Sequence, residues 1–204
     1  MSNFTCLDAG IYKIKKSSTD KSSPSKASKA SNTGKNIERF LDAHVNGIRN
    51  GRIGIKNDKA YKLDRNGVPY HTVLKELQNT KIKQKTKHYI WYIFPQPPFK
   101  GYRVSMTSRY FNIDEEEVEL FLLNYKLRNN LGLALSALEK KGFNAQQLGY
   151  YFTPQGDNYK FASFREFFLE VIPNLKKKKS ISKSIQEDIQ RIEKMLKKLE
   201  IDTK

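Results

Sequence analysis

After residue 36, apolar side chains recur every three or four positions, as they do along amphipathic helices. The predicted helices cover residues 37–48, 70–77, 114–142, 144–152, 161–172 and 180–200. Asn36 is the expected N-cap of the first helix, and Asp114 is that of the third. Pro173 is expected to end the fifth helix, because a proline inside a helix removes a backbone hydrogen bond.

A small β-hairpin is predicted between the first two helices. Gly47 ends the first helix, and residues 52–63 then form two short runs around the turn residues Asn57 and Asp58. We therefore expect an all-α fold, a single compact helical domain with a small β-hairpin inserted at about residues 47–69.

Residues 88–94, His-Tyr-Ile-Trp-Tyr-Ile-Phe, form an apolar run whose secondary structure the pattern leaves open between strand and helix. Pro95 disfavours helical geometry at Phe94, so the element ends there. The run holds the only tryptophan of the chain, Trp91, and one of its three histidines, His88.

The last predicted helix places six aliphatic side chains three or four residues apart on one narrow face. This apolar seam consists of Ile181, Ile185, Ile189, Ile192, Leu196 and Leu199. Two alternatives remain open. The seam packs back onto its own domain, or it joins a partner helix or a second copy as in a coiled coil.

The 204 residues carry a formal net charge of +17. Residues 1–36 contribute +5 and residues 174–204 another +5, which leaves +7 for residues 37–173. We expect a basic tail over residues 1–36, disordered because it is rich in Lys, Ser, Thr and Asn, then a helical domain over 37–173 and a lysine-rich linker and helix over 174–204. Such charge favours contact with polyanions such as nucleic acid through the basic tails.

Cys6 is the only cysteine, so no intramolecular disulfide can form. No apolar run approaches the roughly 20 residues of a membrane span, and the first residues lack the layout of a secretory signal. We expect a cytoplasmic or nuclear protein that is not secreted, and the spacing of the histidines predicts no metal site.

Common catalytic motifs are absent: the sequence has no phosphate-binding glycine loop, no His-Glu-x-x-His pair and no Gly-x-Ser-x-Gly elbow. Residues 115–117, three successive glutamates, are interpreted as solvated charges at a helix start. His44 and His71 are interpreted as structural histidines. His88 differs because Trp91 and Tyr92 would shield its imidazole and Lys87 would lower its pKa, so a neutral ring could accept a proton.

The motif His88-x-x-Trp91-x-x-Phe94-Pro95-Gln96 resembles the signature of the DUF1810 family of helical proteins, some of which are labelled calpastatin. The family usually has tryptophan where this chain has Tyr89. Further similar motifs are residues 37–43, with His44 where glutamine is usual, residues 109–110, 116–117 and 121–122, and the closing motif 157–163 with Phe168. The likeness covers about residues 37–172, and the hairpin looks like an insertion relative to the family.

The resemblance implies an all-α domain with no established reaction and no cofactor, and it brings together polar residues that are distant in sequence. The candidate catalytic residues are His88 and Asp157, and the candidate ligand-binding residues are Trp91, Gln96, Arg109, Tyr110, Lys160 and Ser163. In a functional pocket the indole would stack on a ring, the imidazole and the carboxylate would handle protons, and Lys160 or Arg109 would meet an anion. In the structural alternative these groups only tie helices together.

Two classes of function follow. The first is a binding or adaptor protein that contacts a polyanion through its tails or a partner protein through helix 180–200. The second is a small-molecule enzyme, a hydrolase or glycosidase acting on a nucleotide-like ligand. Charge and helices favour the first narrowly.

Overall fold

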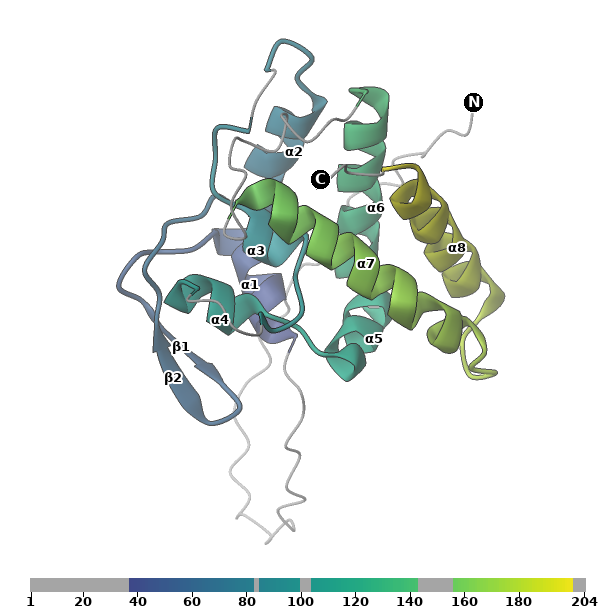
Figure 1. The fold of residues 1–204 in the computed structure, drawn as a ribbon, viewed down its shortest axis with the longest axis horizontal. Coiled ribbons are helices and arrows are strands. Elements are labelled where there is room, and N and C mark those ends of the chain that lie inside the picture. Colours follow the sequence, from purple (N-terminus) through teal and green to yellow (C-terminus); the bar gives the residue numbers. More distant parts are fainter. Residues whose placement is uncertain (1–36, 83–84, 100–103, 143–155, 200–204) are drawn as a thin grey trace, which may run out of the picture. The chain divides into compact units, whose positions relative to one another are not determined.

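The computed structural model describes residues 37–82, 85–99, 104–142 and 156–199. Its elements are α1 (Glu38–Asn46), β1 (Ile53–Lys56), β2 (Lys59–Lys62), α2 (Tyr70–Gln78), α3 (Ile90–Ile93), α4 (Met106–Phe111), α5 (Glu115–Leu123), α6 (Tyr125–Lys140), α7 (Asp157–Lys176) and α8 (Lys183–Lys198) (Figure 1). The predicted helical class with one antiparallel hairpin is confirmed. The expected N-cap Asn36 and the expected helix 144–152 lie outside the described residues.

The first helix ends at Gly47, as predicted, because the chain needs a left-handed residue there with φ of 72°. A Cβ at this position would stand 2.4 Å from the carbonyl oxygen of Gly67. Gly47 comes this close because its neighbour Ile48 forms an antiparallel bridge with Gly67. This bridge joins the two ends of the segment that contains the hairpin.

The hairpin pairs β1 with β2 in the register Ile53 to Lys62 and Lys56 to Lys59. Asn57 and Asp58 both adopt positive φ, which is the geometry of a two-residue hairpin turn. One face of the hairpin packs on α4, because Gly54 leaves room for the ring of Tyr110.

Helices α5 and α6 are separate, whereas the sequence predicted one continuous stripe. Asp114 forms the predicted cap, and its carboxylate accepts from the backbone N–H of Glu117. Asn124 ends α5 and caps α6, since its side chain accepts from the backbone N–H of Leu127. The chain therefore changes direction there, and Tyr125, the first residue of α6, is 72% exposed.

The interpretation of residues 115–117 as solvated charges is wrong for Glu117, which is buried. Its carboxylate accepts from Nη1 of Arg39 at 2.6 Å, and both side chains are only 2% exposed. A second cation, Lys56, lies with its Nζ 3.8 Å from the same carboxylate. Periodicity cannot reveal such a pair, because its partners come from helices far apart in sequence.

The expectation that Pro173 ends the last domain helix is also wrong, because α7 continues to Lys176. The fixed φ of proline suits a helix, and only one backbone donor is lost. The continuation beyond Pro173 buries Leu175 completely, on the same core side of the helix as Phe161, Phe164 and Phe168. The hydrophobic contacts outweigh the missing hydrogen bond.

The apolar seam of the last helix packs onto its own domain, which decides between the two alternatives left open by the sequence. Helix α8 packs against α6 and α7, and Ile189 and Leu196 have no exposed surface (Figure 1). Arg128 of α6 donates to Asp188 at 3.1 Å, which ties the first half of α8 to α6. Arg165 of α7 donates to the carbonyl of Leu196 at 2.7 Å, which ties the last turn of α8 to α7.

The apolar run 88–94 forms a single helical turn, α3, at the centre of the core. All four residues of α3 are buried, and α3 contacts α1, α4, α6 and α7. Phe94, with φ of −125° and ψ of 71°, is not helical, so α3 ends before Pro95, as predicted. No helix in the described part of the chain has the length and apolar character needed to cross a membrane.

Candidate functional site

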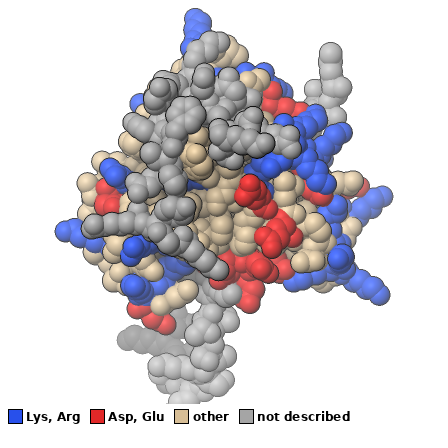
Figure 2. Space-filling view, in the orientation of Figure 1, with Lys and Arg blue, Asp and Glu red and all other residues tan. Residues whose placement is uncertain are grey.

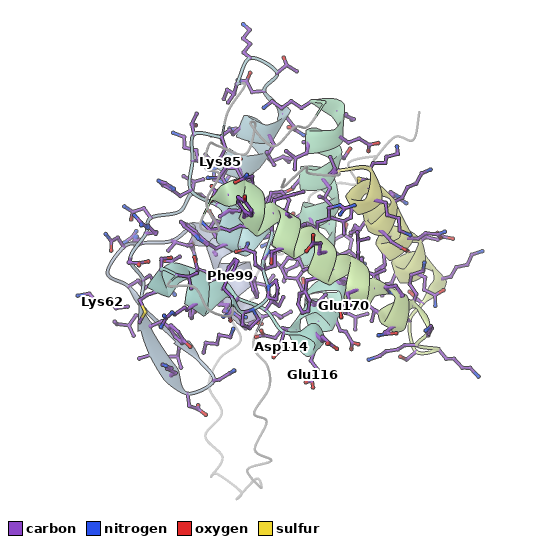
Figure 3. All side chains as sticks on the ribbon, viewed as in Figure 1. Lys62, Lys85, Phe99, Asp114, Glu116 and Glu170 are labelled. Carbon is purple, nitrogen blue, oxygen red and sulfur yellow. The ribbon has the colours of Figure 1, made fainter. Side chains whose placement is uncertain are left out.

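Five polar and aromatic side chains meet where α7 begins over α3, and we call this cluster the junction site. Its members are Lys85, His88, Trp91, Asp157 and Lys160. The first two come from the loop before α3, Trp91 from α3, and the last two from the first turn of α7. Figure 3 shows Lys85 lying at that first turn. Four of the eight predicted site residues therefore converge.

The aromatic part of the junction site is a stacked pair. The imidazole of His88 lies on the indole of Trp91 with 6.1 Å between ring centroids and 19° between planes. Trp91 is only 5% exposed, whereas His88 is exposed. The indole that the sequence offered for stacking is therefore covered, and the imidazole of His88 lies outside it. The buried Nε1–H of Trp91 has no hydrogen-bond acceptor among the described residues.

The charged part of the junction site places two ammonium groups on one carboxylate. Asp157 accepts through Oδ2 from Lys85, and through Oδ1 from Lys160 at 3.1 Å. The side chains of Lys85 and Lys160 are 6% and 11% exposed, so the group is screened from water. Nζ of Lys160 also lies 5.6 Å from the ring centre of Trp91, within the range of a cation–π contact.

Partial burial against its neighbours lowers the pKa of His88, because a charged imidazole would lose hydration there. The positive charge of Lys85 lowers it further, and the carboxylate of Asp157 opposes this effect. Arg65 and Lys160 add to the lowering. His88 is therefore neutral at pH 7, as the sequence predicted, with Lys85 as the main cationic neighbour in place of Lys87.

Gln96 has a structural role. It is buried, and its Nε2 donates to the carbonyl of Phe94 and, at 3.3 Å, to that of Ile90. These bonds satisfy carbonyl groups at the end of the one-turn helix α3. Its backbone carbonyl accepts from the N–H of Ile113, which ties the segment after α3 to the start of α5.

Arg109 and Tyr110 belong to α4 and lie against the hairpin side of the molecule. Tyr110 packs on Phe111 at 4.8 Å and on Tyr61 of β2 at 5.9 Å between ring centroids, while Arg109 is exposed. Ser163 is half-buried on α7, one turn beyond Lys160 and on the same side of the helix. None of these contacts joins α4 to the junction site.

Sequence reasoning missed Lys85. The only signal was the lysine-rich stretch 81–87, which holds four lysines and no acid. Nothing in that composition distinguishes the lysine that folds inward. Only the tertiary structure shows that Lys85 joins the junction site. Its Nζ lies between Asp157 and the ring of Tyr89, 5.0 Å from the ring centre.

His44 is the structural histidine that the sequence predicted. Its Nε2 lies 2.9 Å from the carbonyl oxygen of Tyr92, and its Nδ1 lies 2.9 Å from Nδ2 of Asn130. Since the amide of Asn130 donates, Nδ1 carries no proton and Nε2 donates to the carbonyl. Burial lowers the pKa of His44 to about 4, although the hydrogen bond to Tyr92 acts in the opposite direction.

Residues 59–191 match the family model described as "Protein of unknown function (DUF1810)". The chain belongs to the DUF1810 family. The match begins in β2 and ends within α8, so it reaches further toward the C-terminus than the likeness in the motifs and does not include α1.

All five members of the junction site lie within the DUF1810 match, whereas His44 lies outside it. Comparison with curated proteins gives no match, and comparison with solved structures gives none either. The family description states no activity.

Proposed function

We propose that the protein binds a small anionic, nucleotide-like molecule at the junction site. The observation that carries the proposal is the charge imbalance of Lys85, Lys160 and Asp157: two screened ammonium groups share a single carboxylate. An excess charge in a poorly hydrated place is costly, and a ligand with a negative group offsets it. Phosphate and carboxylate groups both fit this chemistry.

The open face of His88 supports a ligand that also carries a flat ring. The ring is neutral at pH 7, exposed on one side and held on the other side by Trp91. A planar ring can stack on it while an attached anion reaches Lys160 or Lys85. The Nε1–H of Trp91, which has no acceptor among the described residues, is a further donor for an acceptor atom that enters the cluster.

Fluorescence of Trp91 tests the proposal, because it is the only tryptophan of the chain and therefore reports on this site alone. Titration with adenosine monophosphate is expected to change the emission with saturation. Inorganic phosphate is expected to compete more weakly, and adenosine without a phosphate weaker still. The absence of any saturable change with all three probes would overturn the proposal.

Lys160→Gln is expected to weaken binding of the monophosphate about tenfold or more, since a hydrogen bond to a charged group contributes roughly 1.5–3 kcal/mol. Lys62→Gln, an exposed hairpin lysine, is the matched control with the same change in net charge. Equal weakening in both variants would mean that overall charge, and not the junction site, attracts the ligand. Thermal unfolding of each variant separates lost binding from lost folding.

The enzyme alternative proposed from the sequence, a hydrolase or glycosidase, is favoured by one observation: His88 is exposed and neutral at pH 7, so it can accept a proton from a bound water or ligand. Asp157 is less suited to proton transfer, because both of its oxygens already accept from lysines. Turnover of a nucleotide-like compound that is lost in His88→Ala, with ligand binding retained, would support this alternative. Retained turnover in His88→Ala would exclude it.

The packing of α8 disfavours an adaptor role through the apolar seam of helix 180–200. The seam residues of α8 contact α6 and α7 and are therefore unavailable to a partner helix in the folded domain. What α8 leaves exposed is its charged side.

A further inference from the structure

The outer side of α8 is strongly basic. Because the apolar seam faces the domain, the side chains on the opposite face of the helix point to solvent. This basic face consists of Lys183, Arg191, Lys194, Lys197 and Lys198, with Glu187 as its exposed acid. The 16 residues of α8 extend it over about 24 Å.

The loop between α7 and α8 continues the basic face with three exposed lysines, residues 177–179. Four of these cations are engaged by carboxylates: Lys178 pairs with Glu119, Lys198 with Glu139, Lys197 with Glu193 and Arg191 with Asp188. For Lys179, Lys183 and Lys194 the described residues supply no carboxylate within ion-pair distance. The surface therefore keeps a positive excess after its internal ion pairs are formed.

A band of acidic side chains borders this surface. Glu115 and Glu116 of α5 and Glu166 and Glu170 of α7 are exposed. Figure 2 shows red side chains over α5 and α7 beside blue side chains over α8 and the loop before it, and Figure 3 labels Glu116 and Glu170. The acidic band would repel a polyanion and the basic face would attract it. A bound polyanion would therefore lie along α8 and not extend over α5 and α7.

We infer that the basic face of α8 and residues 177–179 bind the phosphate backbone of a nucleic acid duplex without regard to sequence. A duplex carries about one negative charge per 1.7 Å of its axis, and so presents a continuous row of anions to a face of this length. The large exposed hydrophobic side chains of the described residues are Val45, Ile53, Ile55, Leu120, Leu123 and Tyr125. None of them belongs to α8, so the face has neither an aromatic platform for unpaired bases nor an apolar anchor for a membrane.

This surface uses none of the junction-site residues, so its test is independent of the proposed small-molecule site. Binding of the full chain to a labelled DNA duplex is measured by fluorescence anisotropy over a range of salt concentrations. The test variant carries Lys179→Gln, Lys183→Gln and Lys194→Gln. The slope of log affinity against log salt is expected to become shallower by about 2.7, since each phosphate contact contributes about 0.9.

The matched control removes three exposed lysines elsewhere, Lys59→Gln, Lys62→Gln and Lys75→Gln, so both variants have the same net charge. The control is expected to keep the wild-type slope. Equal losses in both variants would overturn the inference in favour of general charge attraction. The absence of duplex binding by the wild-type chain would overturn it outright. Binding to vesicles of phosphatidylserine with no binding to the duplex would replace the nucleic acid by a membrane surface.

Discussion

Replacing His44 by glutamine is expected to make the protein more resistant to acid. In the folded state the imidazole is buried and neutral, with Nδ1 accepting from Asn130 and Nε2–H donating to the carbonyl of Tyr92. Protonation would set Nδ1–H against the amide N–H of Asn130. A glutamine amide has an oxygen that can accept from Asn130 and an NH2 group that can donate to the carbonyl of Tyr92, but it does not titrate.

The magnitude follows from the lowered pKa. The folded pKa of His44 lies at about 4, below its ordinary value of 6.5. The unfolded chain therefore binds more protons between these two values, and the free energy of unfolding falls as the pH falls. This stabilising contribution is complete above pH 6.5. Its loss amounts to about 2 kcal/mol at pH 5 and to about 3 kcal/mol near pH 4.

Urea unfolding followed by Trp91 fluorescence at pH 7 and pH 5 measures the effect. Between these two values, wild-type protein is expected to lose about 2 kcal/mol more than His44→Gln. The comparison cancels contributions that both proteins share, including that of His88, whose lowered pKa acts in the same direction. Identical pH dependence in the two proteins, or an NMR spectrum showing a charged His44 ring at pH 5, would refute the reasoning.

Three further substitutions test the packing. Arg39→Met leaves Glu117 buried without its nearest cation and is expected to cost about 3 kcal/mol in chemical unfolding; a loss under about 1 kcal/mol would mean that Lys56 suffices as partner. Gly47→Ala is expected to lower the melting temperature clearly more than Gly51→Ala, because both have positive φ but only Gly47 is crowded; equal losses would contradict this account. Ile189→Ala removes a fully buried side chain and is expected to cost roughly 2–5 kcal/mol, and unchanged stability would show that α8 does not pack as described.

Local patterns in the sequence were sufficient for the elements whose causes are local. The hairpin turn at Asn57 and Asp58 and the cap at Asp114 were predicted correctly, because each depends on the conformational preferences of one or two residues. The end of α1 at Gly47 was also predicted correctly, because it depends on the positive φ that glycine adopts readily. The helical class followed from periodicity, since apolar residues that recur every three or four positions are typical of amphipathic helices.

Predictions failed where long-range packing outweighed local preference. Pro173 did not end α7, because burying Leu175 offset the lost hydrogen bond. The helix expected over residues 114–142 is divided in two at Asn124. The burial of Glu117 depended on Arg39, a residue 78 positions earlier in the chain. No window of sequence contains both partners of such a pair.

By itself, the sequence determined the helical class, the hairpin, the cap at Asp114 and the amphipathic character of the last helix, because these depend on the spacing and backbone preferences of neighbouring residues. Only the tertiary structure decided that α8 turns its seam toward α6 and α7 and its lysines outward. It also decided that Lys85, among four lysines of its loop, joins Lys160 on the carboxylate of Asp157. Both outcomes depend on which surfaces come into contact in the folded protein, and the spacing of residues along the chain does not specify those contacts.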